Sequence, residues 1–170
     1  MKLAHSLTEF VTILLLLLCL SGCGASATLQ VEKEIPSVPI RPISFTLVAA
    51  PGVPLSEQEL NALRARFIDS LAWEGGLRVG PNDSFKVIGT VTQYDLAPLH
   101  RPLLMAWVPS HFDSTWVVRD EHDQTIGSAR IMGGTSFNSR FETDDTVLEK
   151  VGERLSDFLT KQYDASRPTK

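Results

Sequence analysis

Apolar residues recur with two different periods along the chain, and the change of period marks the predicted elements. Residues 43–50 are mostly apolar and β-branched, which predicts a buried or half-buried strand. The next apolar residues recur at intervals of three and four, which predicts an amphipathic helix. They are Leu60, Leu63, Phe67 and Leu71. Ser56 and Glu59 have the spacing of a capping box, so we expect the helix to begin at Ser56 and to end at Gly75-Gly76.

The second half of the chain shows the same two kinds of pattern. Strand patterns are predicted for residues 77–79, 85–95, 112–120 and 124–132. The last two should form a hairpin that Gly133-Gly134 ends. A final amphipathic helix should begin at Thr143 or Asp144. Its apolar stripe consists of Leu148, Val151, Leu155, Phe158 and Leu159.

The order of these elements, strand, helix, several strands, helix, favours an α+β fold. Each amphipathic helix needs an apolar surface against its stripe, and one face of a sheet can serve both helices. We therefore predict a two-layer sandwich, in which an antiparallel or mixed sheet of about five strands carries two amphipathic helices on one face. This single domain should span residues 43–163, and a flexible tail should follow at 164–170.

The N-terminus carries an apolar run, Val11 to Leu20, that is about half the length needed to cross a membrane. Such a run fits the hydrophobic region of a secretory signal. Ser21 and Gly22 follow it and directly precede Cys23. These residues resemble the lipobox of bacterial lipoproteins, in which a leucine and two small residues precede a lipid-modified cysteine. The alternatives are an ordinary secretory signal and an N-terminal anchor that is never cut.

The lipobox resemblance implies that residues 1–22 are a signal peptide and that Cys23 becomes the lipid-modified N-terminus. In such lipoproteins the cysteine carries a diacylglyceryl group and usually a third acyl chain, and two or more chains anchor a protein stably. Gly24 stands where some lipoproteins carry an aspartate that retains them at the inner membrane. The implied location is the cell envelope, and in a Gram-negative cell the outer membrane, facing the periplasm.

A tether should join this anchor to the domain. Residues 23–42 begin with small and polar side chains and then contain Pro36, Pro39 and Pro42, a spacing that favours extended polyproline II structure. At about 3.1 Å per residue, such a segment could hold the domain up to roughly 60 Å from the lipid. We therefore assign residues 23–42 to the lipidated N-terminus and a proline-rich tether.

Charge and cysteine content exclude several classes of partner and site. The net charge of −4 leaves no basic footprint for nucleic acid. Of the two cysteines, Cys19 leaves with the signal and Cys23 takes the lipid, so the folded part has no thiol for a disulfide, a metal or a nucleophile. His100, His111 and His122 fall on different loops. We therefore expect neither a metal site nor a cofactor.

Two short motifs lie within the predicted domain. One strand reads VIGTVTQYD (residues 87–95), and a Val-Val-x-Asp hairpin follows at residues 117–120. Together with the terminal amphipathic helix, these motifs resemble a broad group of uncharacterised bacterial lipoproteins that carry a domain of unknown function. The resemblance covers about residues 43–163. It implies an envelope lipoprotein and supplies no catalytic residues.

The segment 96–111, LAPLHRPLLMAWVPSH, is the main candidate for a functional surface. It joins two predicted strands, yet it is several times longer than the usual hairpin connection of about 2–5 residues. Its prolines exclude a long regular helix or a central strand. Its apolar residues either fold back onto the domain or form an exposed patch for a protein partner or a membrane surface. The partner-binding candidates are Arg101, Leu103, Leu104, Met105, Trp107 and Val108.

Candidate catalytic groups are few. Ser110-His111 lacks the G-x-S-x-G turn that holds a serine nucleophile, and residues 133–136 lack the lysine and spacing of a P-loop. We therefore expect a non-enzymatic envelope lipoprotein, an accessory or interaction module anchored at Cys23 that binds another envelope component. The alternative is an envelope enzyme or small-ligand-binding protein acting on cell-wall material. A closed pocket that gathers Ser110, His111 and Asp113 would favour this alternative.

Overall fold

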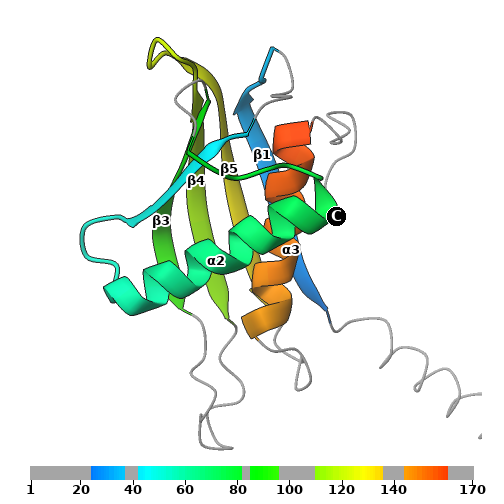
Figure 1. Cartoon of the computed structure of the whole chain (residues 1–170). Helices are drawn as coiled ribbons and strands as arrows, with labels where there is room; N and C mark the ends of the chain where they lie inside the picture. Colours follow the sequence, from blue (N-terminus) through cyan, green and yellow to red (C-terminus); the bar gives the residue numbers. More distant parts are fainter. Residues whose placement is uncertain (1–23, 37–41, 82–84, 96–109, 136–143, 161–170) are drawn as a thin grey trace, which may run out of the picture.

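A computed structural model of the chain describes residues 24–36, 42–81, 85–95, 110–135 and 144–160. These residues form β1 (Ala25–Lys33), β2 (Ser44–Ala49), α2 (Glu57–Glu74), β3 (Lys86–Asp95), β4 (His111–Arg119), β5 (Thr125–Thr135) and α3 (Asp144–Thr160). Figure 1 shows a twisted sheet with both helices packed against it. The predicted α+β class is confirmed.

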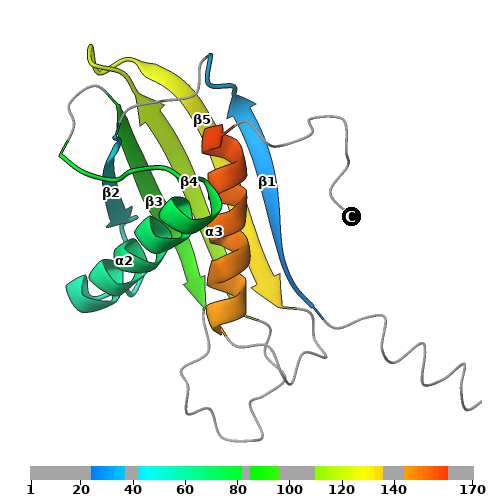
Figure 2. The same cartoon turned by 45° about the vertical axis from the view of Figure 1, so that its right-hand side comes forward.

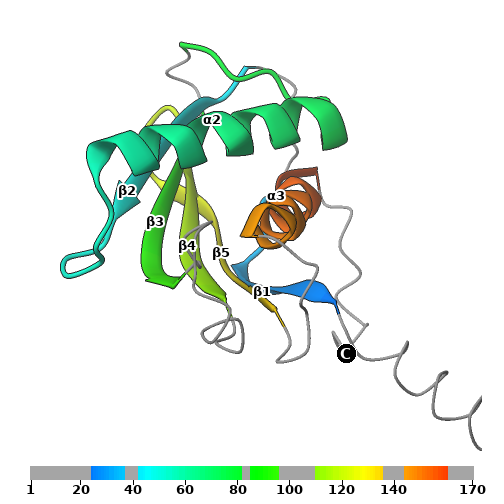
Figure 3. The ribbon, with the colours of Figure 1, turned by 90° about the horizontal axis from the view of Figure 1, so that it is seen from below.

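The sheet has the order β1-β5-β4-β3-β2, so β1 and β2 form its two edges. Neighbouring strands are antiparallel except for β2 and β3, which are parallel and are connected through α2. α3 packs over β1 and β5, α2 packs over β2, and the two helices contact each other. Figures 2 and 3 show both helices on one face of the sheet. No described helix covers the other face.

The centre of the core is the indole of Trp116, which is fully buried on the central strand β4. Its ring centroid lies 5.5 Å from that of Phe67 on α2 and 5.6 Å from that of Phe45 on β2. The indole N–H donates to the hydroxyl of Ser114 at 2.9 Å, so this buried polar group keeps a partner. Gly89 leaves room for the ring, because a Cβ there would lie 2.4 Å from it.

The predicted capping box is present at the start of α2. The hydroxyl of Ser56 accepts from the backbone N–H of Glu59, and the Glu59 carboxylate accepts from the backbone N–H of Ser56 at 2.8 Å. The pKa of Glu59 lies below its ordinary value, because its carboxylate accepts hydrogen bonds from Ser56. The bond from the hydroxyl has the larger effect and the bond from the backbone N–H the smaller. At the other end, Gly75 caps the helix and Gly76 adopts a φ of 59°, which favours glycine. The predicted bounds of the helix are thus confirmed.

The predicted tether is wrong for residues 25–33, because these residues form the strand β1. This strand pairs with β5, and the pairing begins with Ala25 opposite Thr135. Its side chains alternate in exposure: Ala27 is buried against the helices, whereas Gln30 is exposed. Ile35, which follows the strand, is fully buried and packs against Gly127. Residues 25–33 and Ile35 therefore belong to the domain, and the described residues from 24 to 36 do not form a long spacer.

Two smaller predictions also differ from the structure. Gly133 and Gly134 lie inside β5 rather than after it. A Cβ at Gly133 would lie 2.6 Å from Val151, so the glycine lets α3 approach the sheet closely. Residues 77–79 form only an isolated bridge, between Ile43 and Val79, instead of a strand.

The place of Ile35 in the core gives a direct test of this correction. We expect Ile35→Ala to lower the free energy of unfolding by about 2–4 kcal/mol, because it leaves a cavity beside Gly127. Urea unfolding measures the change. Val48→Ala is the control, since Val48 is 42% exposed and its loss should cost little. If Ile35→Ala is as stable as the parent, Ile35 is not part of the core, and the prediction of a tether over residues 24–42 would stand.

The contact between Gly89 and Trp116 gives a second test. We expect Gly89→Ala to destabilise the protein by about 1–3 kcal/mol, because the added methyl group forces the buried indole from its position. Gly80→Ala is the matched control, since a Cβ there meets nothing within 4 Å. Equal unfolding midpoints for the two variants in urea would show that the indole is not held as tightly as described.

Candidate functional site

Several strand ends meet where the chain enters the sheet. Asp95, the last residue of β3, lies opposite His111, the first residue of β4. His111 in turn lies opposite Gly134 of β5, and Thr135 lies opposite Ala25, the first residue of β1. We call this the Ala25 end of the sheet. It is the lower end in Figure 1, where α3 also begins, and Figure 3 looks onto it from below.

Hydrogen bonds fix the Ala25 end. The backbone N–H of Thr135 donates to the carbonyl of Ser110 at 3.1 Å, and the N–H of Ser110 donates to the hydroxyl of Thr135 at 3.0 Å. On the neighbouring strand, the amide of Gln93 donates to the carboxylate of Asp95 at 2.7 Å. The points at which residues 96–109 leave and rejoin the sheet are therefore well defined.

The predicted site residues themselves lie outside the described residues. Cys23 belongs to residues 1–23, and the six partner-binding candidates belong to residues 96–109. The flanking residues are described, and they lie together at the Ala25 end. Three strand spacings of about 4.8 Å separate β1 from β3, so roughly 14 Å lies between Ala25 and Asp95. Among the described residues, no helix is both long enough and apolar enough to cross a membrane.

An ion pair that the sequence analysis missed lies near this end, on the face of the sheet that no described helix covers. Both carboxylate oxygens of Asp113 accept from Nε of Arg130, at 3.1 and 3.2 Å, and Nη2 of Arg130 also donates to Asp113. The Asp113 side chain is 13% exposed and that of Arg130 46%. Hydrogen bonding to Asp113 raises the pKa of Arg130. The carboxylate is thus committed to the guanidinium, in a charge-assisted arrangement.

This ion pair bears on the enzyme alternative, which a closed pocket that gathers Ser110, His111 and Asp113 would favour. Asp113 instead binds Arg130, and Ser110 is held through its backbone. The arrangement therefore does not resemble a Ser–His–Asp relay. Within the described ranges, no group of three or more His, Cys, Asp or Glu residues is placed to hold a metal ion.

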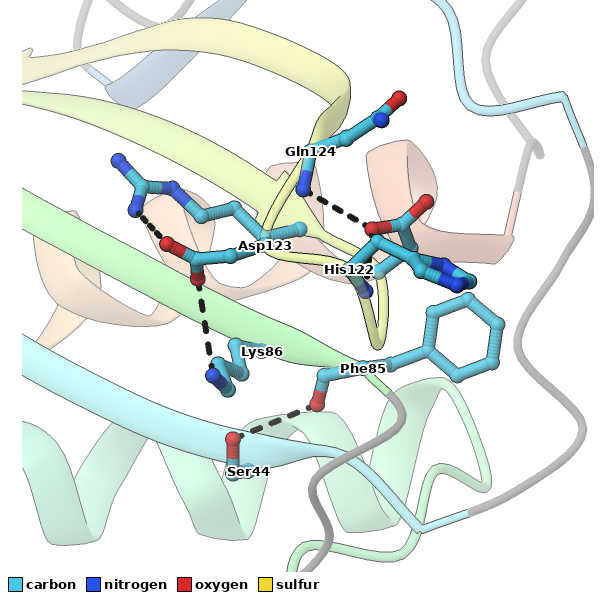
Figure 4. Close-up of polar contacts among 8 residues, drawn as sticks. Ser44, Phe85, Lys86, His122, Asp123 and Gln124 are labelled. Atoms are coloured by element: carbon cyan, nitrogen blue, oxygen red, sulfur yellow. Dashed lines mark hydrogen bonds and ion pairs between the residues drawn. The ribbon is translucent and has the colours of Figure 1, made fainter.

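The opposite end of the sheet is closed by the β4–β5 turn (Figure 4). The carboxylate of Asp120 accepts from two backbone N–H groups of the turn, each at 2.9 Å. Asp123, with a φ of 60°, binds Arg119 at 2.9 Å and lies 3.6 Å from Lys86 of β3. The side chain of His122 is exposed. These contacts tie β3 to the hairpin, which is a structural role.

A groove that the sequence analysis also missed lies between α2 and α3 and has a volume of about 710 Å³. Trp73 of α2 stands at this groove with 87% of its surface exposed. The sequence held a signal for the exposure of Trp73, because Trp73 comes two residues after Leu71 and so lies off the apolar stripe of α2.

Solved structures share this fold. A PelC dodecamer from Paraburkholderia phytofirmans, in a single-substitution variant, superposes with a TM-score of 0.56 at 13% identity, covering 80% of this chain and 99% of that one. A second PelC dodecamer from the same organism gives a TM-score of 0.55 at 11% identity, covering 78% and 97%. The chain shares the PelC fold.

The likeness beyond PelC is weaker. A protein from Xanthomonas campestris in a family of unknown function reaches a TM-score of 0.46 at 11% identity, covering 76% of this chain and 92% of that one, which is too low to support an argument. No protein-family model and no curated sequence matches the chain. The PelC fold is therefore shown, whereas function must be argued from the chain itself.

The Asp113–Arg130 pair yields a prediction. We expect Arg130→Ala to lower the free energy of unfolding, because it leaves a mostly buried carboxylate without its partner. In a double-mutant cycle with Asp113→Asn, the double variant should lose clearly less than the sum of the two single losses. Urea unfolding measures all four proteins. Strictly additive losses would mean that the two side chains do not stabilise each other.

Proposed function

We propose that this chain is a lipid-anchored, non-enzymatic protein of the cell envelope that binds another envelope protein through residues 96–109. The observation that supports this proposal most strongly is the shared position of two chain segments. The N-terminal anchor and the apolar segment both continue from the Ala25 end of the sheet, at Ala25 and at Asp95 and Ser110 respectively.

The length of chain before β1 limits how far the anchor can lie from the domain. Cys23 precedes Ala25 by two residues, and two residues span at most about 7 Å. With acyl chains on Cys23, the Ala25 end would face the bilayer surface. In a Gram-negative cell this surface would be the periplasmic face of the outer membrane, since Gly24 is not the retaining aspartate. The domain would then sit on the membrane without a spacer.

The composition of residues 96–109 fits a protein contact at this surface. Arginine, methionine and tryptophan are enriched at interfaces, and Arg101, Met105 and Trp107 supply one of each. Leu103 and Leu104 add apolar area beside them. Because both ends of the segment are held on neighbouring strands, these side chains would be presented near the membrane from a fixed base. We do not favour the enzyme alternative, because the Asp113 carboxylate binds Arg130.

Self-assembly is part of the proposal. The PelC structures with this fold are dodecamers. In the described part of this chain, β1 and β2 are sheet edges, and an unpaired edge offers backbone groups to a neighbouring chain. We therefore propose that several copies associate on the membrane, which would multiply the weak contacts of each segment.

Photo-crosslinking tests the proposed binding segment. A photoreactive amino acid placed at Trp107 of the full-length protein in cells should give one dominant protein adduct, because this position would face the partner. The adduct should disappear when Leu103 and Met105 are changed to serine. The control places the same group at Glu121, which lies in the turn at the opposite end of the sheet. Equal adduct patterns at positions 107 and 121 would contradict the proposal.

The anchor is tested separately. Cys23→Ser should release the protein from the membrane fraction, since it removes the site of lipid attachment. Cell fractionation followed by immunoblotting measures the change. If Cys23→Ser stays with the membrane and the signal of the unsubstituted protein is also uncut, the uncleaved-anchor alternative is correct. The crosslinking result would then still report on residues 96–109.

A further inference from the structure

The groove between α2 and α3 is a second surface, separate from residues 96–109. It forms where α2 crosses the first half of α3, and an ion pair between Arg66 and Asp145 joins the two helices there. Ala72 and Leu148 provide apolar lining, and Trp73 stands beside them. The groove is open to solvent and has a volume of about 710 Å³, which leaves room for a side chain from another molecule.

The groove carries an excess of negative charge. Its ionisable lining consists of Arg66, Asp69, Glu74, Asp145 and Glu149. Arg66 pairs with Asp145, whereas Asp69, Glu74 and Glu149 form no ion pair with any described residue. Three carboxylates without an ion-pair partner among the described residues therefore line the same groove as the exposed indole.

The polarity of α2 increases this excess. Glu74 is the last residue of α2, and no basic residue is present in the last turn. The C-terminal end of a helix carries a partial negative charge that favours a cation and disfavours a carboxylate. The sequence places Glu74 against this preference, and a bound cation would compensate for it.

We infer that this groove binds an arginine- or lysine-bearing segment of a protein partner. The cationic head of such a residue would lie over the face of Trp73, which is the strongest aromatic partner for a cation. Its aliphatic stem would pack along Ala72 and Leu148, as long basic side chains commonly do. The carboxylates of Asp69, Glu74 and Glu149 would surround the charge. An arginine or lysine side chain therefore matches both the apolar and the acidic parts of the groove.

A labelled hexa-arginine peptide tests this inference by fluorescence anisotropy, with the full-length protein in a non-ionic detergent. Trp73→Ala should weaken binding about fivefold, because the cation loses the indole face. The affinity of Trp73→Phe for the peptide should lie between those of the parent protein and of Trp73→Ala, since phenylalanine binds a cation more weakly than tryptophan does. Trp73 is so exposed that neither variant should disturb the fold. Glu74→Gln should also weaken binding, by about threefold.

The matched control is Glu121→Gln, which removes one exposed carboxylate at the far end of the sheet and should leave binding unchanged. A loss equal to that of Glu74→Gln would reveal a general electrostatic effect and overturn the inference. Unchanged binding by Trp73→Ala would also overturn it. So would tighter binding after deletion of residues 161–170, because the chain's own basic tail, with Lys161, Arg167 and Lys170, would then be the occupant.

Discussion

Burial of the Trp116 indole between the central strand and α2 is the contact on which the rest of the structure depends. The ring meets Phe67 of α2 and Phe45 of β2, and it fits only because Gly89 carries no side chain. This packing sets the position of α2 across the sheet. The position of α2 in turn determines where it crosses α3, which creates the groove beside Trp73.

A second close approach, of α3 onto Gly133 of β5, determines the other half of the layer. It brings α3 over β1 and β5, so the first strand is held both by its pairing and by a helix. Because β1 begins at Ala25, only two residues of the sequence separate Cys23, the proposed site of the lipid anchor, from the sheet. The same sheet end carries the strand ends that flank residues 96–109. The proposed anchor and the proposed binding segment therefore both adjoin the Ala25 end of the sheet.

Local patterns were enough to predict the class of the fold, the two helices and four of the strands. The capping box of Ser56 and Glu59, for example, is a signal read within four residues. β1 was missed because its inward positions begin with Ala25 and Ala27, which are small enough to resemble a linker, although Leu29 continues the alternation. The Asp113–Arg130 pair and the groove could not be predicted, since they depend on strand register and on the crossing of two helices. Residues 96–109 remain a prediction from composition.

The central claim is that the Ala25 end of the sheet faces the membrane. A fluorophore on a single introduced cysteine tests it most directly, at Asp95 or at Glu121, with the lipidated protein in vesicles that contain headgroup-labelled quencher lipids. The two positions lie at opposite ends of the sheet, roughly 30 Å apart at about 3.3 Å per strand residue. With the Ala25 end at the membrane, we expect strong quenching at Asp95 and little at Glu121. Equal quenching, or stronger quenching at Glu121, would contradict the claim.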